Sequence, residues 1–157
     1  MLYEELDHDN ADIRLLTILP STEFAAALEC TLIKVSLLDE PSYWGLSYVW
    51  GDLSLTTPII VNNIEKHVTT NLASALRHIR KIGSPLTLWV DAVCINQDDL
   101  AERSRQVQKM GQIFQQAEGV HVWLGDDEDG GERAMATICQ WSKALSRLGI
   151  RDLTTLN

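Results

Sequence analysis

The chain has 157 residues, of which 45% are hydrophobic and 22% charged, and these values predict one globular domain with a single core. Its formal net charge of -9 argues against nucleic acid or an anionic membrane surface as a partner, because both would repel it. No apolar stretch approaches the roughly 20 residues of a membrane span, and the N-terminus is acidic rather than a basic signal peptide.

The first half of the chain is predicted to be rich in strands. A short strand is expected over 13–20, and a half-exposed strand over 29–38, where apolar and polar residues alternate. The aromatic segment YWGLSYVWG at 43–51 predicts a more buried strand that ends at a turn. A small hairpin is expected over 58–68 around two successive asparagines, because asparagine tolerates left-handed turn positions.

Strands and helices alternate through the second half. Helices are predicted over 71–82 and 99–117, with a strand over 87–94 between them. A buried strand at 120–124 and a third helix at 132–148 follow. The alternation favours an α/β fold with one sheet whose centre is parallel. The expected inward-facing residues are Leu72, Ala75, Leu76, Ile79 and Ile82 in the first helix, and Leu100, Val107, Met110, Phe114 and Ala117 in the second.

Polar groups gather where three of the predicted strands end. The stretch LWVDAVCINQDD at 88–99 shows this best, because an apolar strand passes into amides and carboxylates. Ligands of open α/β sheets bind beyond the carboxyl ends of the strands, so these groups are expected to share one rim and form a cleft. The rim groups are Ser47, Tyr48, Trp50, Gly51, Asp52, Asp91, Cys94, Asn96, Gln97, Asp98, Trp123, Gly125 and Asp126.

Each of these groups also has a plainer structural interpretation. Asp91 can bind loop backbone amides, and the tryptophans can be packing residues rather than stacking platforms. Asp98 or Asp99 can cap the following helix. Asp99 and Glu102 have capping-box spacing, so Glu102 can reach back to a backbone N–H and take no part in chemistry. Cys94 has no histidine at an obvious spacing, which disfavours a nucleophilic role.

Cysteine and histidine usage indicates the setting of the protein. Three widely spaced cysteines argue against a disulfide framework, and four scattered histidines suggest no metal site. The acidic run at 126–131 does not match a calcium loop, because Glu132 stands where the loop glycine should be. We therefore expect a cytoplasmic protein without a bound metal.

Three segments resemble the fungal heterokaryon incompatibility (HET) domain: YWGLSYVWGD, VTTNLASALRHIR and LWVDAVCINQDDLAERSRQVQKMGQIFQQAEGVHVWLGD. The similarity covers most of residues 13–126 and preserves the order and spacing of the family's motifs. Two positions depart from the common pattern: Gly45 stands where the family usually has alanine, and Phe114 where tyrosine is usual. Residues 1–157 are therefore interpreted as a single HET domain that is part of a longer protein.

The resemblance implies a cell-death effector role in fungal self/non-self recognition, with regulatory domains or incompatibility proteins as partners. HET domains are remotely similar to TIR domains. That similarity implies a TIR-like, flavodoxin-like three-layer sandwich with a mainly parallel central sheet, plus an additional N-terminal strand and hairpin region. TIR-like enzymes typically complete their sites by stacking, so self-association is expected, through the hairpin at 58–68 or an edge strand at 29–38.

The resemblance also implies a reaction. Some TIR domains cleave NAD at the nicotinamide–ribose bond with a glutamate on the helix after a central strand, and Glu102 is the matching residue here. A carboxylate near the ribose can stabilise the oxocarbenium charge that develops as this bond breaks. NAD or a related nucleotide is therefore the expected substrate; as a redox cofactor it is not expected, because there is no GxGxxG motif. The substrate-binding candidates are Tyr48, Trp50, Gly51, Asp52, Asp91, Asn96 and Gln97.

Helical geometry alone does not assign a role to Glu102. At 100° per residue, it lies about 110° from the centre of the apolar stripe, a position compatible with a cleft or with solvent. Two main hypotheses follow. The first is an effector that hydrolyses NAD, and the second is a non-catalytic signalling module that oligomerises and recruits partners. Nucleotide binding without turnover is a third.

Overall fold

The computed structural model describes residues 2–7 and 10–125. Residues 1–123 form one compact unit and residues 124–157 a second, and every strand and helix reported below belongs to the first. The helix predicted over 132–148 lies outside the described residues. No helix in the described part of the chain is long and apolar enough to cross a membrane.

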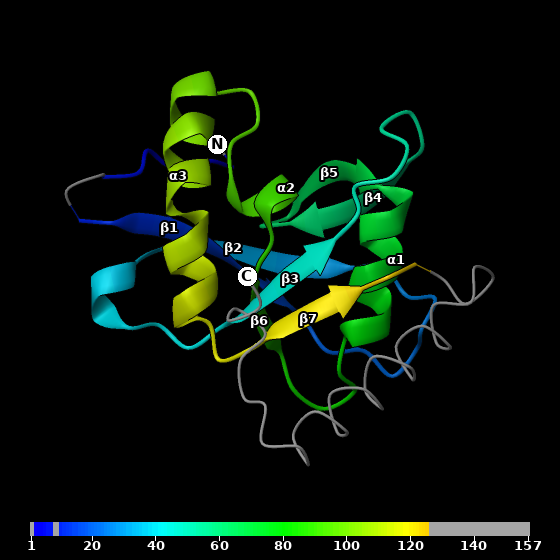
Figure 1. Ribbon diagram of the computed structural model, residues 1–157. Coiled ribbons are helices and arrows are strands. Elements are labelled where there is room, and N and C mark those ends of the chain that lie inside the picture. The colour runs from blue at the N-terminus through cyan, green and yellow to red at the C-terminus, as the bar shows by residue number, and fades with distance from the viewer. Residues whose placement is uncertain (1, 8–9, 126–157) are drawn as a thin grey trace, which may run out of the picture. The chain divides into compact units, whose positions relative to one another are not determined.

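Seven strands form one sheet in the order β5-β4-β2-β1-β6-β3-β7 (Figure 1). The strands are β1 (Asp12–Ile18), β2 (Glu29–Ser36), β3 (Trp44–Tyr48), β4 (Thr56–Val61), β5 (Ile64–Thr69), β6 (Leu86–Trp89) and β7 (Val120–Trp123). The helices are the 3-10 turn η1 (Leu37–Asp39), α1 (Thr70–Ile79), α2 (Asp91–Cys94) and α3 (Leu100–Gln116). The predicted α/β class is therefore confirmed.

The sheet is mixed, so the prediction of a mainly parallel sheet is wrong. β1 lies between β2 and β6 and pairs antiparallel with both, and β5 returns antiparallel to β4. The N-terminal strands are therefore not an addition beside the sheet but its middle. The three predicted strands β3, β6 and β7 are parallel neighbours, as expected.

β1 occupies the centre of the sheet because both of its faces are apolar. Ile13, Leu15, Leu16 and Ile18 are all buried, and a strand of this kind is stable only when both faces are covered. Arg14 is the exception, a buried cation in the middle of the strand. The predicted alternating burial of β2 is confirmed. The prediction that β2 is an edge strand is wrong, because it lies between β4 and β1.

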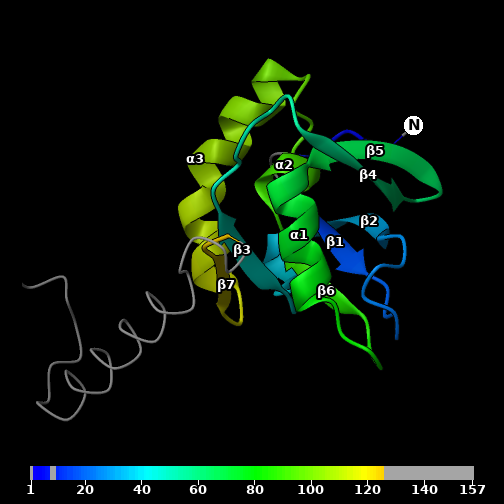
Figure 2. The ribbon, with the colours of Figure 1, turned by 90° about the vertical axis from the view of Figure 1, so that its right-hand side faces the viewer.

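The two long helices lie on different parts of the sheet. α3 crosses β1 and contacts it through Gln106 and Glu102, while α1 packs against β4 and β5 (Figures 1 and 2). α1 ends earlier than predicted, because Arg80 takes an extended conformation and its guanidinium donates to backbone carbonyls between Glu23 and Ala27. Ile82, expected to face inward, is exposed as a consequence.

The predicted apolar stripe of α3 is partly wrong. Leu100 and Val107 are 67% and 52% exposed, while the polar residues Glu102 and Gln106 are buried. The reason lies on β1: the Gln106 side chain donates to the backbone oxygen of Asp12, and Glu102 pairs with Arg14. These polar contacts set the rotation of the helix against the sheet. A prediction based on hydrophobic residues alone does not take such contacts into account.

The strand predicted over 87–94 is shorter than expected. β6 ends at Trp89, and the chain turns at once into the four-residue helix α2. Asp91 is therefore the first residue of this helix and not a mid-strand acid. Its carboxylate accepts a hydrogen bond from the backbone N–H of Ala92, a local contact that competes with strand pairing.

Candidate functional site

Glu102 and Arg14 form a buried ion pair between α3 and β1. Arg14 Nη1 and Nη2 donate to Glu102 Oε1 and Oε2 at 2.6 and 2.9 Å, so the pair is bidentate. The two side chains are only 2% and 8% exposed. Glu102 Oε1 also accepts from the backbone N–H of Asn96 at 2.7 Å. Both carboxylate oxygens are thus held in fixed positions by charge-assisted bonds.

The capping-box interpretation of Glu102 is not what the structure shows. Asp99 is the N-cap of α3, and its side chain accepts from the backbone N–H groups of Ala101 and Glu102. The hydrogen bond from the Glu102 N–H holds the pKa of Asp99 below its usual range, and the Ala101 N–H adds to this effect. The Glu102 side chain turns inward to Arg14 and Asn96 instead of back toward the helix start.

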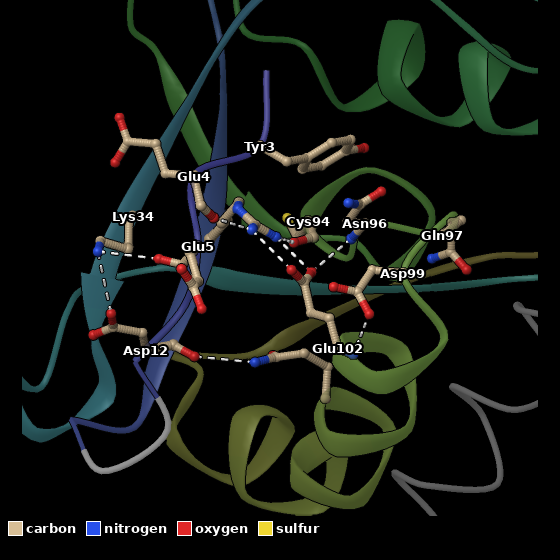
Figure 3. A network of polar contacts seen from close by, with 12 residues as sticks. Tyr3, Glu4, Glu5, Asp12, Lys34, Cys94, Asn96, Gln97, Asp99 and Glu102 are labelled. Atoms are coloured by element: carbon tan, nitrogen blue, oxygen red, sulfur yellow. Dashed lines mark hydrogen bonds and ion pairs between the residues drawn. The ribbon is translucent and has the colours of Figure 1, made fainter. Parts of the chain in front are cut away.

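The ion pair borders a half-open pocket of about 240 Å³. Residues 3–6, near the N-terminus, cover part of the pocket, and the Glu102 side chain points toward them (Figure 3). Asn96 and Arg105 also line the pocket. The pocket combines carboxylates and cations, and is lined by Tyr3, Glu4, Glu5, Leu6, Arg14, Asn96, Asp99, Glu102 and Arg105.

A second polar group, which we call the Asp91 cluster, forms where β3 and β6 end, and comprises Tyr48, Trp50, Asp91 and Gln97. Trp50 Nε1 donates to Asp91 Oδ2 at 2.9 Å, and Gln97 Nε2 donates to the Asp91 backbone oxygen at 2.9 Å. The Tyr48 hydroxyl is buried near the Asp91 carboxylate. Burial and the nearby Asp91 carboxylate raise the pKa of Tyr48 well above its usual range.

The remaining rim candidates are less connected. Asp52 is exposed, and its carboxylate accepts from the backbone and hydroxyl of Ser54, which together lower its pKa. Gly51 has a φ of +76°, a left-handed conformation that suits glycine in this turn. Asp126 lies outside the described residues. The contacts thus fall into an Asp91 cluster and a Glu102 pocket, with Asp52 bound only within its own turn.

Cys94 has the environment of a packing residue. It is fully buried, its Sγ accepts from the backbone N–H of Val90, and burial raises its thiol pKa to about 12. A nucleophilic cysteine needs a depressed pKa and access to substrate. Among residues 2–7 and 10–125, no group of histidine, cysteine or carboxylate side chains could hold a metal ion.

Two residues of these networks were missed from the sequence. Arg14 was visible as a lone cation in an apolar strand, a pattern that predicts a buried partner. Asn71, at the start of α1, joins the loop after β3 to the end of β7: its Nδ2 donates to the Val49 oxygen, and its Oδ1 accepts from Trp123 Nε1 at 2.9 Å. Nothing in the spacing of Asn71 distinguishes it from a helix-start asparagine.

Comparison with known proteins assigns the family. The heterokaryon incompatibility protein (HET) family matches residues 43–154. Heterokaryon incompatibility protein 6, OR allele, of Neurospora crassa is 37% identical over 148 residues, which cover 86% of this chain. The chain spans 22% of the length of that relative, and no solved structure matches it. These similarities show that the chain belongs to the HET family.

Proposed function

We propose that this chain is a cell-death effector domain in fungal heterokaryon incompatibility, acting in the cytoplasm. The observation that carries the proposal is the family membership, together with 37% identity to an incompatibility protein over 86% of the chain. Because the chain matches 22% of that relative, regulatory regions or partner proteins elsewhere are expected to supply the incompatibility signal.

The chemistry we propose is hydrolysis of NAD, with Glu102 as the catalytic residue. The bond between the ribose C1′ and the nicotinamide nitrogen breaks, nicotinamide leaves with the bonding electrons, and water adds to C1′ with release of a proton. Glu102 would stabilise the positive charge on the ribose. Its support is a fixed carboxylate at a half-open pocket, beside Asn96.

For this reaction the Glu102 carboxylate must be able to bind the substrate. Both carboxylate oxygens are engaged by Arg14 and Asn96, so a ribose hydroxyl must share or replace one of these bonds. Asn96 is the substrate-binding candidate nearest to Glu102. Contact of the substrate with Tyr48, Trp50, Gly51, Asp52, Asp91 and Gln97 stays a prediction, as does a TIR-like arrangement of the complete fold.

A non-catalytic scaffold is the second candidate, and the surface favours it in one respect. The loop after β3 exposes Val49, Leu53 and Leu55, each at least 60% accessible. The hairpin of β4 and β5 lies at the end of the sheet, so β5 presents an unpaired edge that a second chain can extend. A scaffold would self-associate and kill cells without consuming NAD.

Inducible expression of this chain in fungal cells tests the effector role. We expect loss of viability within the induction period, accompanied by a fall in cellular NAD if the catalytic proposal is correct. Viable cells that contain folded chain at high level contradict the effector role. If the cells die while their NAD level stays constant, and light scattering shows that the purified chain assembles, the chain acts as a scaffold and the catalytic proposal is wrong.

A further inference from the structure

The first residues of the chain form an extended segment laid over the sheet. Residues 2–7, which we call the N-terminal strap, contain no helix or strand, yet Leu6 is 4% exposed. Figure 3 shows strap residues Tyr3, Glu4 and Glu5 between Lys34 on one side and Asn96 on the other, above Glu102. The strap therefore covers the face of the sheet on which the Glu102–Arg14 pair lies.

The strap is held by a few separate contacts rather than by strand pairing. Arg14 Nη2 donates to the Glu4 backbone oxygen, and Lys34 Nζ donates to the Glu5 backbone oxygen at 3.2 Å. The Tyr3 hydroxyl donates to the Val93 oxygen at 3.2 Å. A segment attached in this way can be released without breaking the sheet, because the pairing of β1 with its neighbours does not involve it.

Tyr3 places an aromatic ring between two cations. The guanidinium of Arg14 lies 4.9 Å from the ring centroid, and the ammonium of Lys66 lies 5.2 Å from it. Both distances are in the range of cation–π attraction. Together with the backbone oxygens of Glu4 and Glu5, which accept from Arg14 and Lys34, the strap presents an aromatic ring and oxygen acceptors to three cations.

The strap also separates two hollows. The pocket beside Glu102 measures about 240 Å³, and a second pocket of about 250 Å³ lies against Leu32 and Lys34. Glu4 of the strap and Arg14 of β1 line both pockets, so the strap forms part of the boundary between them. Each pocket is smaller than the roughly 300–1,000 Å³ typical of sites for drug-sized ligands, whereas a joined hollow reaches that range.

We propose that the N-terminal strap is a displaceable cover that occupies the ligand site of this domain. The ligand class follows from what the strap offers to Arg14, Lys34 and Lys66: a planar aromatic ring followed by oxygen acceptors, a combination that the base and the phosphate oxygens of a nucleotide also provide. Displacement of the strap joins the two pockets and opens Glu102 to the ligand. The identity of that ligand as NAD rests on the proposed function, whereas the competition between strap and nucleotide does not.

Nucleotide binding to strap variants tests the competition. Titration calorimetry would measure the affinity for NAD and for ADP-ribose, which lacks the nicotinamide–ribose bond and so reports binding without hydrolysis. Tyr3→Ala removes the ring and its hydroxyl and is expected to tighten binding of both probes at least tenfold. Tyr3→Phe keeps the ring on the cations and should lie between Tyr3→Ala and the parent. Leu38→Ala, at an exposed site on η1, is the matched control and should bind as the parent does.

Amide hydrogen exchange of the parent gives a second measurement that needs no substitution. Saturating ADP-ribose should speed exchange in residues 2–7 and slow it around Asn96. The proposal is overturned if Tyr3→Ala binds no tighter than the parent, including the case in which neither binds, or if ADP-ribose leaves the strap amides unchanged or protects them. Absence of nicotinamide release in variants that bind tightly would contradict NAD hydrolysis while leaving the strap assignment standing.

Discussion

The ion pair of Arg14 and Glu102 is the residue-level feature that joins the two halves of the chain, 88 positions apart. Removing two charges from water is costly, and their attraction offsets this only when the geometry is good and the remaining hydrogen bonds are made. Here the pair is bidentate, and Cys94 and Asn96 supply a further acceptor and donor from the main chain. Loss of either side chain would leave the other charge buried alone.

Replacing Glu102 alone should therefore destabilise the fold. Glu102→Gln leaves the Arg14 guanidinium without its counter-charge, and we expect a loss of about 3–5 kcal/mol of unfolding free energy. Arg14→Met combined with Glu102→Gln should recover most of the loss, because the acceptor for the Asn96 N–H is kept and no lone charge remains. Urea unfolding of the two variants checks this, and equal losses would contradict it.

Gly45 and Phe114, the two departures from the common family pattern, lie in contact. A Cβ at position 45 would meet the Phe114 ring at 2.7 Å, so the glycine makes room for the ring. Gly45→Ala is expected to cost about 1–3 kcal/mol by overpacking. Gly111, inside α3 with open space around it, is the control: Gly111→Ala should stabilise by about 0.5–1 kcal/mol. A Gly45→Ala protein as stable as the parent in thermal unfolding would refute the packing account.

At the level of elements, the hairpin of β4 and β5 shows how the sequence determines a turn and a strand junction together. Asn62 and Asn63 have φ values of +51° and +62°, as the two central residues of a tight hairpin require. Asn62 does more than turn the chain. Its Oδ1 accepts from the Leu32 N–H and its Nδ2 donates to the Leu32 oxygen, both at 2.9 Å. The side chain thus continues the short pairing between β2 and β4.

Two glycine substitutions separate these roles. Both Asn62→Gly and Asn63→Gly keep the left-handed turn, but only the first removes the two hydrogen bonds to Leu32. With about 0.5–1.5 kcal/mol for each bond, Asn62→Gly should lose about 1–3 kcal/mol. Asn63→Gly should be close to neutral. Chemical denaturation of the two variants measures the difference, and similar losses for both would show that the Leu32 contacts contribute little.

The elements that the sequence predicted well are those with local signals. The hairpin followed from two asparagines, α1 from its apolar spacing, and the parallel set β3, β6 and β7 from the alternation with helices. The rotation of α3 and the early end of β6 could not be predicted. The rotation of α3 depends on a contact between distant segments, Gln106 with Asp12, and β6 ends early where the Asp91 carboxylate accepts from the N–H of Ala92; hydrophobic periodicity encodes neither contact.

For the molecule as a whole, the unexpected feature is the central place of β1. Alternation of strands and helices suggested a parallel sheet, but the hydrophobic strand nearest the N-terminus inserts antiparallel between β2 and β6. The central position of β1 also alters the candidate site, because it brings Arg14 of β1 into contact with Glu102 of α3. The sequence predicted carboxylates and amides at the strand ends, but neither the pairing of Glu102 with Arg14 nor the division of the candidates into an Asp91 cluster and a Glu102 pocket.

Asp12, the first residue of β1, should make the free energy of unfolding depend on pH in the acid range. Burial alone would raise the pKa of Asp12, but bonds from the Asp7 N–H and Asn10, with the charge of Lys34, lower it below 3.8. The folded state then binds a proton less readily than the unfolded chain. The stabilisation is complete above about pH 4 and is lost as the pH falls through the depressed pKa. Asp12→Asn should flatten this dependence between about pH 4 and 2. Unfolding titrations of both proteins test it; parallel pH profiles would exclude Asp12 as the cause.

Release of nicotinamide from NAD by the purified chain tests the central proposal most directly. It should be followed at high protein concentration for the parent and for Arg14→Met/Glu102→Gln, with melting curves to show that both are folded. The account predicts release by the parent and a rate lower by about 10²-fold or more in the double variant, as loss of an electrostatic contribution of about 3 kcal/mol requires. A folded double variant that releases nicotinamide at the parent's rate would contradict the role of Glu102, and a parent that kills fungal cells without releasing nicotinamide would contradict the reaction itself.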